Sequence, residues 1–238
     1  MNLLHLYRNE RFIVFLEKVK KVFYKVLPQY AILPFIIIIG MNVVTYYGSQ
    51  LITNHLYHYD VTFLMPNDFP LVPSFIYIYI LAYVQWIVGY IIIARENKKV
   101  CYEILSAEFI AKFLCLICFF LFPTKMSRPE VFGTGFSIFL THTVYRLDPA
   151  INLFPSIHCL ESWMCFRGSQ TLKKVKSGYL LGQFVFSFFV ILSTILVHQH
   201  VWIDVIGGIF VVEVGLYLAR KFQTGQIFEN ILTRISRN

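Results

Sequence analysis

Long apolar stretches separated by short basic segments constrain the fold of this chain more than any other feature. A helix needs about 20 mostly apolar residues to cross the roughly 30 Å hydrocarbon core of a bilayer. The mean hydropathy of +0.63 is far above that of a soluble domain. The apolar stretches lie near residues 31–51, 75–93, 102–122, 154–167, 178–197 and 202–220. The sequence therefore predicts an all-α integral membrane protein built as a six-helix bundle, in which the fourth helix is short.

Basic residues in alternate connections predict the orientation of the bundle. Lys and Arg cluster in the N-terminal segment, in the second and fourth connections and in the C-terminal tail, whereas the connection 52–74 contains none. By the positive-inside rule, both termini are expected in the cytoplasm. The topology thus accounts for the net charge of +8 without a nucleic-acid partner. We expect a multi-pass protein, in the plasma membrane if the chain is bacterial.

The first 30 residues combine basic side chains with a continuous apolar face. This pattern is typical of an amphipathic helix that lies in the membrane interface. We therefore expect an interfacial segment over residues 1–30, a six-helix membrane domain over 31–221 and a cytoplasmic tail over 222–238. The residues of the apolar face are Leu3, Leu4, Tyr7, Phe12, Phe15, Leu16, Val19, Val22 and Phe23.

The third connection breaks the charge pattern. Lys125, Arg128 and Arg146 stand on the side of the membrane where few cations are expected. Such cations indicate either an anionic substrate or ordinary solvated loop charges. Arg128 can hold two phosphate oxygens with its guanidinium group, and Lys125 can add a further positive charge.

Two further segments place polar groups on the same side. His200 and Asp204 are four residues apart at a helix start, so the carboxylate can accept a hydrogen bond from the imidazole. An imidazole oriented in this way can attack phosphorus or act as a base, although the pair can also be purely structural. Ser156 and His158 follow Pro155 at another helix start, where free N–H groups suit phosphate oxygens.

Other polar and aromatic residues inside the helices have structural interpretations. Glu108 and Lys112 are four apart and are expected to pair. Glu161 either orients His158 or bonds to a neighbouring helix. No cluster has the density of carboxylates that a metal centre needs. Packing and interfacial roles are expected for the aromatic residues Tyr46, Tyr47, Tyr77, Tyr79, Tyr83, Trp86 and Tyr90.

The combination of these segments resembles the phosphatidic-acid-phosphatase type 2 superfamily. The signatures of this family are a lysine followed at seven residues by Arg-Pro, then Pro-Ser-Gly-His, then Ser-Arg with a histidine six residues later and an aspartate four beyond it. The resemblance spans residues 122–204 and agrees with the six-helix topology of the family. The matching residues are Arg128, Pro129, Pro155, Ser156, His158, Ser193, His200 and Asp204.

The resemblance implies a two-step reaction. His200 would attack phosphorus, Asp204 would orient His200, and His158 would protonate the leaving group. Arg128, Ser156 and backbone N–H groups, including that of Ile157, would stabilise the charge on the phosphoryl oxygens. No cofactor or metal is implied.

Three positions depart from the family pattern. Leu121 stands where the first signature has lysine, Ile157 replaces glycine, and Thr194 replaces the arginine of the third signature. Lys125 is then expected to replace the missing lysine in part. His198, one turn after Thr194, is expected near the phosphate, so we count Thr194 and His198 among the phosphate-binding candidates.

We therefore expect a metal-independent membrane lipid phosphatase that hydrolyses a lipid phosphate or diphosphate through a phosphohistidine at the extracytoplasmic face. One alternative is a lipid phosphotransferase that moves a phospho-headgroup between lipids, similar to inositol phosphorylceramide synthases. The other alternative, motivated by Leu121 and Thr194, is a non-catalytic lipid-binding or transport protein on the same scaffold. The sequence leaves the oligomeric state open.

Overall fold

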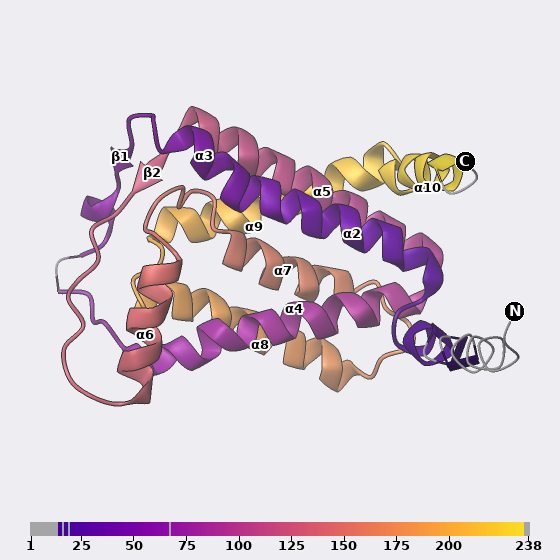
Figure 1. Ribbon diagram of the computed structural model, residues 1–238, viewed down its shortest axis with the longest axis horizontal. Helices are drawn as coiled ribbons and strands as arrows, with labels where there is room; N and C mark the ends of the chain where they lie inside the picture. The colour runs from indigo at the N-terminus through magenta and orange to yellow at the C-terminus, as the bar shows by residue number, and fades with distance from the viewer. Residues whose placement is uncertain (1–13, 16, 19, 67, 236–238) are drawn as a thin grey trace, which may run out of the picture.

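The structure is a computed structural model that describes residues 14–235 except 16, 19 and 67. Its secondary structure is almost all helical, and its long helices lie roughly along one axis (Figure 1). The helices are α2 (Gln29–Val43), the π-helix η1 (Val44–Gly48), α3 (Ser49–Thr53), the 3-10 helices η2 (Thr62–Leu64) and η3 (Pro73–Phe75), α4 (Ile76–Glu96), α5 (Lys98–Leu121), α6 (Phe136–Leu147), α7 (Ile157–Ser169), α8 (Ser177–Leu196), α9 (Trp202–Lys221) and α10 (Thr224–Ile235). The strands are β1 (Tyr59–Asp60) and β2 (Thr124–Lys125).

Five helical segments of the described chain are long and apolar enough to cross a bilayer. These are Gln29–Thr53, Pro73–Glu96, Lys98–Leu121, Ser177–Leu196 and Trp202–Lys221. They confirm the expected all-α membrane fold with several crossings. The sixth expected helix is α7, whose 13 residues extend only about 20 Å. The count of six spanning helices therefore stays a prediction.

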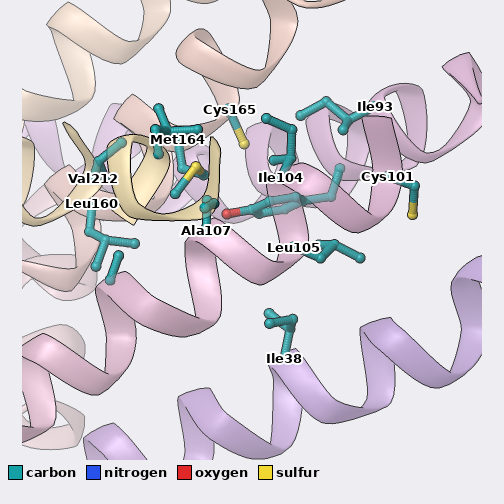
Figure 2. Close-up of a cluster of buried hydrophobic side chains, with 14 of the residues drawn as sticks. Ile38, Ile93, Cys101, Ile104, Leu105, Ala107, Leu160, Met164, Cys165 and Val212 are labelled. Carbon is teal, nitrogen blue, oxygen red and sulfur yellow. The ribbon is translucent and has the colours of Figure 1, made fainter. Parts of the chain in front are cut away.

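Helix α7 lies inside the bundle and contacts α4, α8 and α9. Its apolar residues Leu160, Met164 and Cys165 are fully buried and join the main core with α5 and α9 (Figure 2). Gly208 of α9 permits a close approach of the two helices, because a Cβ there would lie 2.6 Å from the carbonyl oxygen of Ser156. The start of α7 is thus held directly against the first turns of α9.

A buried charge network joins α5, α7 and α4. The Lys112 ammonium lies 2.6 Å from Glu108 and 2.7 Å from Glu161, and the Tyr90 hydroxyl donates to Glu161 at 2.8 Å. The expected pair of Glu108 and Lys112 is confirmed. Of the two interpretations of Glu161, the structure has the bond to neighbouring helices, because Lys112 and Tyr90 occupy its carboxylate.

The connections at one end of the bundle are bound to each other. β1 pairs in parallel with β2, with Tyr59 opposite Thr124 and Asp60 opposite Lys125. Lys125 also forms a bridge to Ile151, just before α7. Figure 1 shows this end, with β1, β2 and α6, opposite the end at which α10 lies. The segments that carry the candidate site are therefore brought to one end of the molecule.

Two helices at the ends of the bundle were not expected from the sequence. α6 lies in the third connection, and it is too short to have been recognised as a spanning segment. α10 occupies the segment expected as a tail, where Glu229 forms a 2.7 Å ion pair with Lys98 of α5 and Leu232 is buried. The amphipathic pattern of this helix leaves an apolar side, which packs on α5.

The expected interfacial helix is described only in part. Residues 20–26 are helical, and Phe15, Val22 and Phe23 expose their apolar side chains. Placement of this segment in the membrane interface stays a prediction. The residues Leu3, Leu4, Tyr7, Phe12, Leu16 and Val19 of that face lie outside the described residues.

Candidate active site

His200 and Asp204 form the pair that their spacing predicts. His200 Nδ1 lies 3.3 Å from Asp204 Oδ2, which also accepts the backbone N–H of Val201 at 2.9 Å. Asp204 is completely buried in the first turn of α9. Because the carboxylate is held by its own helix start, it fixes the imidazole of His200 through Nδ1 and leaves Nε2 available for other contacts.

His158 lies opposite His200 at the start of α7. The centroids of the two rings are 6.4 Å apart. The His158 ring is stacked on Tyr79 of α4 at 4.1 Å and contacts the edge of Trp86 at 5.1 Å. Its Nε2 atom is buried and has no hydrogen-bond partner among the described residues. A buried polar atom of this kind is costly unless a ligand can satisfy it.

Ser156 caps α7 and ties it to α9. Its Oγ accepts the backbone N–H of Cys159 at 3.3 Å, and its own N–H donates to the carbonyl oxygen of Asp204 at 3.0 Å. The Ile157 side chain packs against the main core. What Ile157 can offer to an anion is therefore its backbone N–H at the open start of the helix, and not its side chain.

Arg128 is held between α6 and the turn before α9. Its guanidinium donates to the carbonyl oxygen of Asp148 at 2.7 Å, donates to the Gln199 side chain and lies 4.6 Å from the centre of the Tyr145 ring. Its Nε is buried and unpartnered among the described residues. Burial lowers the pKa of Arg128 and the Asp148 carboxylate raises it, but an arginine stays charged in such a site.

Lys125 lies in β2 with an exposed side chain that forms no ion pair within the described residues. Leu121, at the position of the family lysine, is also exposed. Within the described part of the chain, neither side chain forms a hydrogen bond or an ion pair with His158 or His200. A phosphate-binding role of Lys125 remains a prediction.

Thr194 and His198 surround the turn that carries His200. The buried Thr194 hydroxyl donates to Ile191 of its own helix, and its carbonyl oxygen accepts the backbone N–H of His200 at 3.2 Å. His198 has a positive φ of 50° and its ring lies 6.0 Å from Phe69. Burial lowers the pKa of His198, while the carbonyl oxygens of Pro70 and Phe69 raise it.

Three residues of the site, Gln199, Asp148 and Tyr79, were not identified as site residues from the sequence. Gln199 is buried and holds Arg128. Asp148 accepts hydroxyl hydrogen bonds from Tyr46 and from Tyr79, which was expected only as a packing aromatic. The signal available for Asp148 was an acidic residue in a connection that also holds Lys125, Arg128, Arg146 and one other carboxylate, Glu130. Among the described residues, no three His, Cys, Asp or Glu side chains form a group that could hold a metal ion.

The sequence matches the family model of the PAP2 superfamily over residues 63–218, which is well over half of the chain. The matched region includes Arg128, His158, His200 and Asp204. No curated relative and no solved structure matches the chain.

Proposed function

Because the chain belongs to the PAP2 superfamily, we propose that it is a metal-independent lipid phosphatase with a phosphohistidine intermediate on His200. The phosphatase and phosphotransferase chemistry of this superfamily acts on lipid phosphates. The observation that carries the proposal is the pair of buried histidines with ring centroids 6.4 Å apart. This separation suits a phosphoryl group with each reacting nitrogen about 3 Å from its target atom.

In the first step, the Nε2 lone pair of His200 forms a bond to phosphorus as the bond from phosphorus to the leaving oxygen breaks. Asp204 holds Nδ1 and stabilises the positive charge that develops on the ring. His158 gives the proton on its Nε2 to the leaving oxygen. The products of this step are the free alcohol or phosphate and the phosphoenzyme.

In the second step, water attacks phosphorus and gives a proton to Nε2 of His158. The bond between phosphorus and His200 breaks, which releases inorganic phosphate and restores both rings. Arg128, the Ser156 hydroxyl and the N–H of Ile157 stabilise the charge on the phosphoryl oxygens in both steps. Lys125 and His198 have auxiliary roles in binding the phosphate, and Thr194 supports the turn that carries His200.

The site faces the extracytoplasmic side in this proposal. It lies at the end of the bundle that carries the connection 52–74, which has no Lys or Arg. The substrate would then be a lipid whose phosphate group is in the outer headgroup region, such as phosphatidic acid, phosphatidylglycerol phosphate or a polyprenyl diphosphate.

Headgroup transfer is the second candidate function. His158 and His200 are each only 8% exposed. A buried phosphohistidine is protected from water, so a lipid hydroxyl group can replace water in the second step. The same residues would act, with the acceptor alcohol in place of water.

The test is turnover of labelled lipid phosphates by the purified protein in detergent micelles. We expect release of labelled inorganic phosphate in the presence of a chelator, loss of turnover in His200→Ala, and normal turnover in His142→Ala. His142 is an exposed histidine of α6 outside the site and serves as the matched control. A labelled phosphodiester in place of free phosphate would select the transfer reaction.

The proposal fails if none of the labelled lipid phosphates is turned over, or if His200→Ala retains near-normal activity. Tight binding of the same lipids without turnover would replace it with a lipid-binding or transport function.

A further inference from the structure

The Tyr79 hydroxyl lies between the Asp148 carboxylate and the His158 ring. Tyr79 donates to Asp148 Oδ2 at 3.0 Å, and its oxygen lies 3.4 Å from Nδ1 of His158. The three residues come from α4, from the residue after α6 and from the first turns of α7. Tyr79 and His158 are 1% and 8% exposed, so this chain of polar groups is shielded from water.

The hydrogens of the hydrogen bonds that join Asp148, Tyr79 and His158 can be assigned from the partners of Asp148. Tyr46 donates to Oδ1 of Asp148 while Tyr79 donates to Oδ2. An ionised carboxylate can accept both hydroxyl hydrogens, one on each oxygen. Because Tyr79 gives its only hydrogen to Asp148, its oxygen accepts the hydrogen on Nδ1 of His158.

The hydrogen-bonded series of Asp148, Tyr79 and His158 is held rigidly at both of its ends. The carbonyl oxygen of Asp148 accepts a 2.7 Å hydrogen bond from Arg128, which joins it to the phosphate-binding part of the site. The His158 ring is stacked on the Tyr79 ring with an angle of 21° between their planes. The orientation of the imidazole is therefore set by a ring contact and a hydrogen bond together.

We propose that Asp148 and Tyr79 are positioning residues that orient His158 and stabilise its doubly protonated form through Tyr79, as Asp204 does directly for His200. The proposal rests on the proposed function, because it gives His158 the role of the acid that protonates the leaving group. Burial makes a second proton on an imidazole costly, a nearby anion reduces that cost, and Asp148 supplies such an anion.

The two-step reaction needs no net proton transfer along the hydrogen bonds from His158 through Tyr79 to Asp148. The proton on Nε2 leaves His158 with the leaving oxygen in the first step and returns from water in the second. The hydrogen on Nδ1 stays on the ring and remains bonded to Tyr79 throughout. Asp148 and Tyr79 therefore change how easily Nε2 is protonated, while no bond of theirs is made or broken.

The other groups that face His158 are also known. Tyr83 and Trp86 of α4 contact the edges of its ring, and His200 lies across the site. Tyr46 reaches the chain through Asp148. Among these groups, Asp148 is the anion, so its removal is expected to dominate any change in the protonation of His158.

The test compares Tyr79→Phe and Asp148→Asn with Tyr77→Phe. Phe at position 79 keeps the ring stacking and removes only the hydroxyl. Tyr77 is an exposed tyrosine of the same helix that packs against Phe136, and it serves as the control. The first readout is the pH dependence of kcat/KM. Since the acid form of His158 is active, we expect the alkaline limb to move to lower pH by about one unit in both variants, with no further shift in the double variant.

The second readout is the ring nitrogen NMR spectrum of His158 in micelles without substrate, assigned by the loss of its signals in His158→Gln. We expect the pH at which the ring gains its second proton to fall in Tyr79→Phe and in Asp148→Asn. Tyr77→Phe should leave both readouts unchanged, and the His200 signals should stay unchanged in all three variants.

The outcomes separate the two proposals. Unchanged pH limbs and NMR titrations in Tyr79→Phe and Asp148→Asn, even with a lower rate, would overturn the positioning role. If the wild-type protein turns over no lipid phosphate, but the His158 titration shifts as expected in Tyr79→Phe and Asp148→Asn, the proposed function is overturned and the positioning role is supported.

Discussion

At the residue scale, His198 and His200 are near neighbours with different surroundings. His200 has the Asp204 carboxylate at 3.3 Å and lies opposite His158. His198 packs its ring against Phe69, and no carboxylate contacts it within the described part of the chain. An imidazole bonded to phosphorus carries positive charge. Of the two rings, that of His200 has a carboxylate beside it that can stabilise this charge. His200 is therefore the expected nucleophile.

We expect labelled phosphoryl groups trapped on the enzyme to be found on His200. His200→Ala should form no phosphoenzyme, and His198→Ala should form it more slowly because His198 lies beside the turn that carries His200. The measurement is rapid quenching without acid, followed by peptide mapping of the label. A label on His198, or its formation in His200→Ala but not in His198→Ala, would reverse the assignment.

At the element scale, buried charge connects the short helix α7 to its neighbours. α7 is less apolar than the spanning helices, and Glu161 anchors it to α5 through Lys112. Glu161 is one turn after His158, so this anchor also fixes the start of α7 and the position of the His158 ring. The position of α7 thus rests on apolar packing in the main core together with the ionic contact of Glu161.

Lys112→Met should strongly destabilise the protein, because two carboxylates that are 0% and 6% exposed would lose their counter-ion. Loss of one partner of a buried ion pair costs about 3–5 kcal/mol. The measurement is unfolding by denaturant in micelles. Lys112→Met combined with Glu161→Gln should be less destabilising than the sum of the single changes, and additive effects would contradict a shared network.

At the scale of the whole molecule, the antiparallel order of helices places the candidate site at one end of the bundle. The end of α3, the start of α4, the end of α5 and the start of α7 all meet there, and α10 lies at the other end (Figure 1). The basic residues of the α4–α5 and α7–α8 connections lie at the α10 end. From the positive-inside rule we therefore predict that the site lies on the extracytoplasmic side.

Labelling of single introduced cysteines tests this orientation. Tyr57 is 76% exposed in the connection before β1, and Lys173 is exposed between α7 and α8. In intact cells or sealed vesicles, Tyr57→Cys should react with a membrane-impermeant maleimide, and Lys173→Cys should react only after permeabilisation. The parent protein, whose cysteines are buried apart from the partly buried Cys118, sets the baseline. The opposite pattern would place the site in the cytoplasm.

Local sequence determined much of the fold and part of the site. The long helices begin and end within a few residues of the apolar stretches, because the thickness of the bilayer and the cost of burying charge set where such helices can end. The contact between His200 and Asp204 was predictable because residues four apart share one face of a helix. The pair of Glu108 and Lys112 follows from the same spacing.

Only the tertiary structure decided which distant residues complete the site. Tyr79 lies 69 residues from Asp148 and 79 from His158, and Arg128 lies 71 residues from Gln199. Nothing in the sequence around Tyr79 distinguishes it from the packing tyrosines of the same helix. Its role depends on how α4, α6 and α7 pack, since hydrogen bonds between separate helices require positions and angles that no periodicity within one helix specifies.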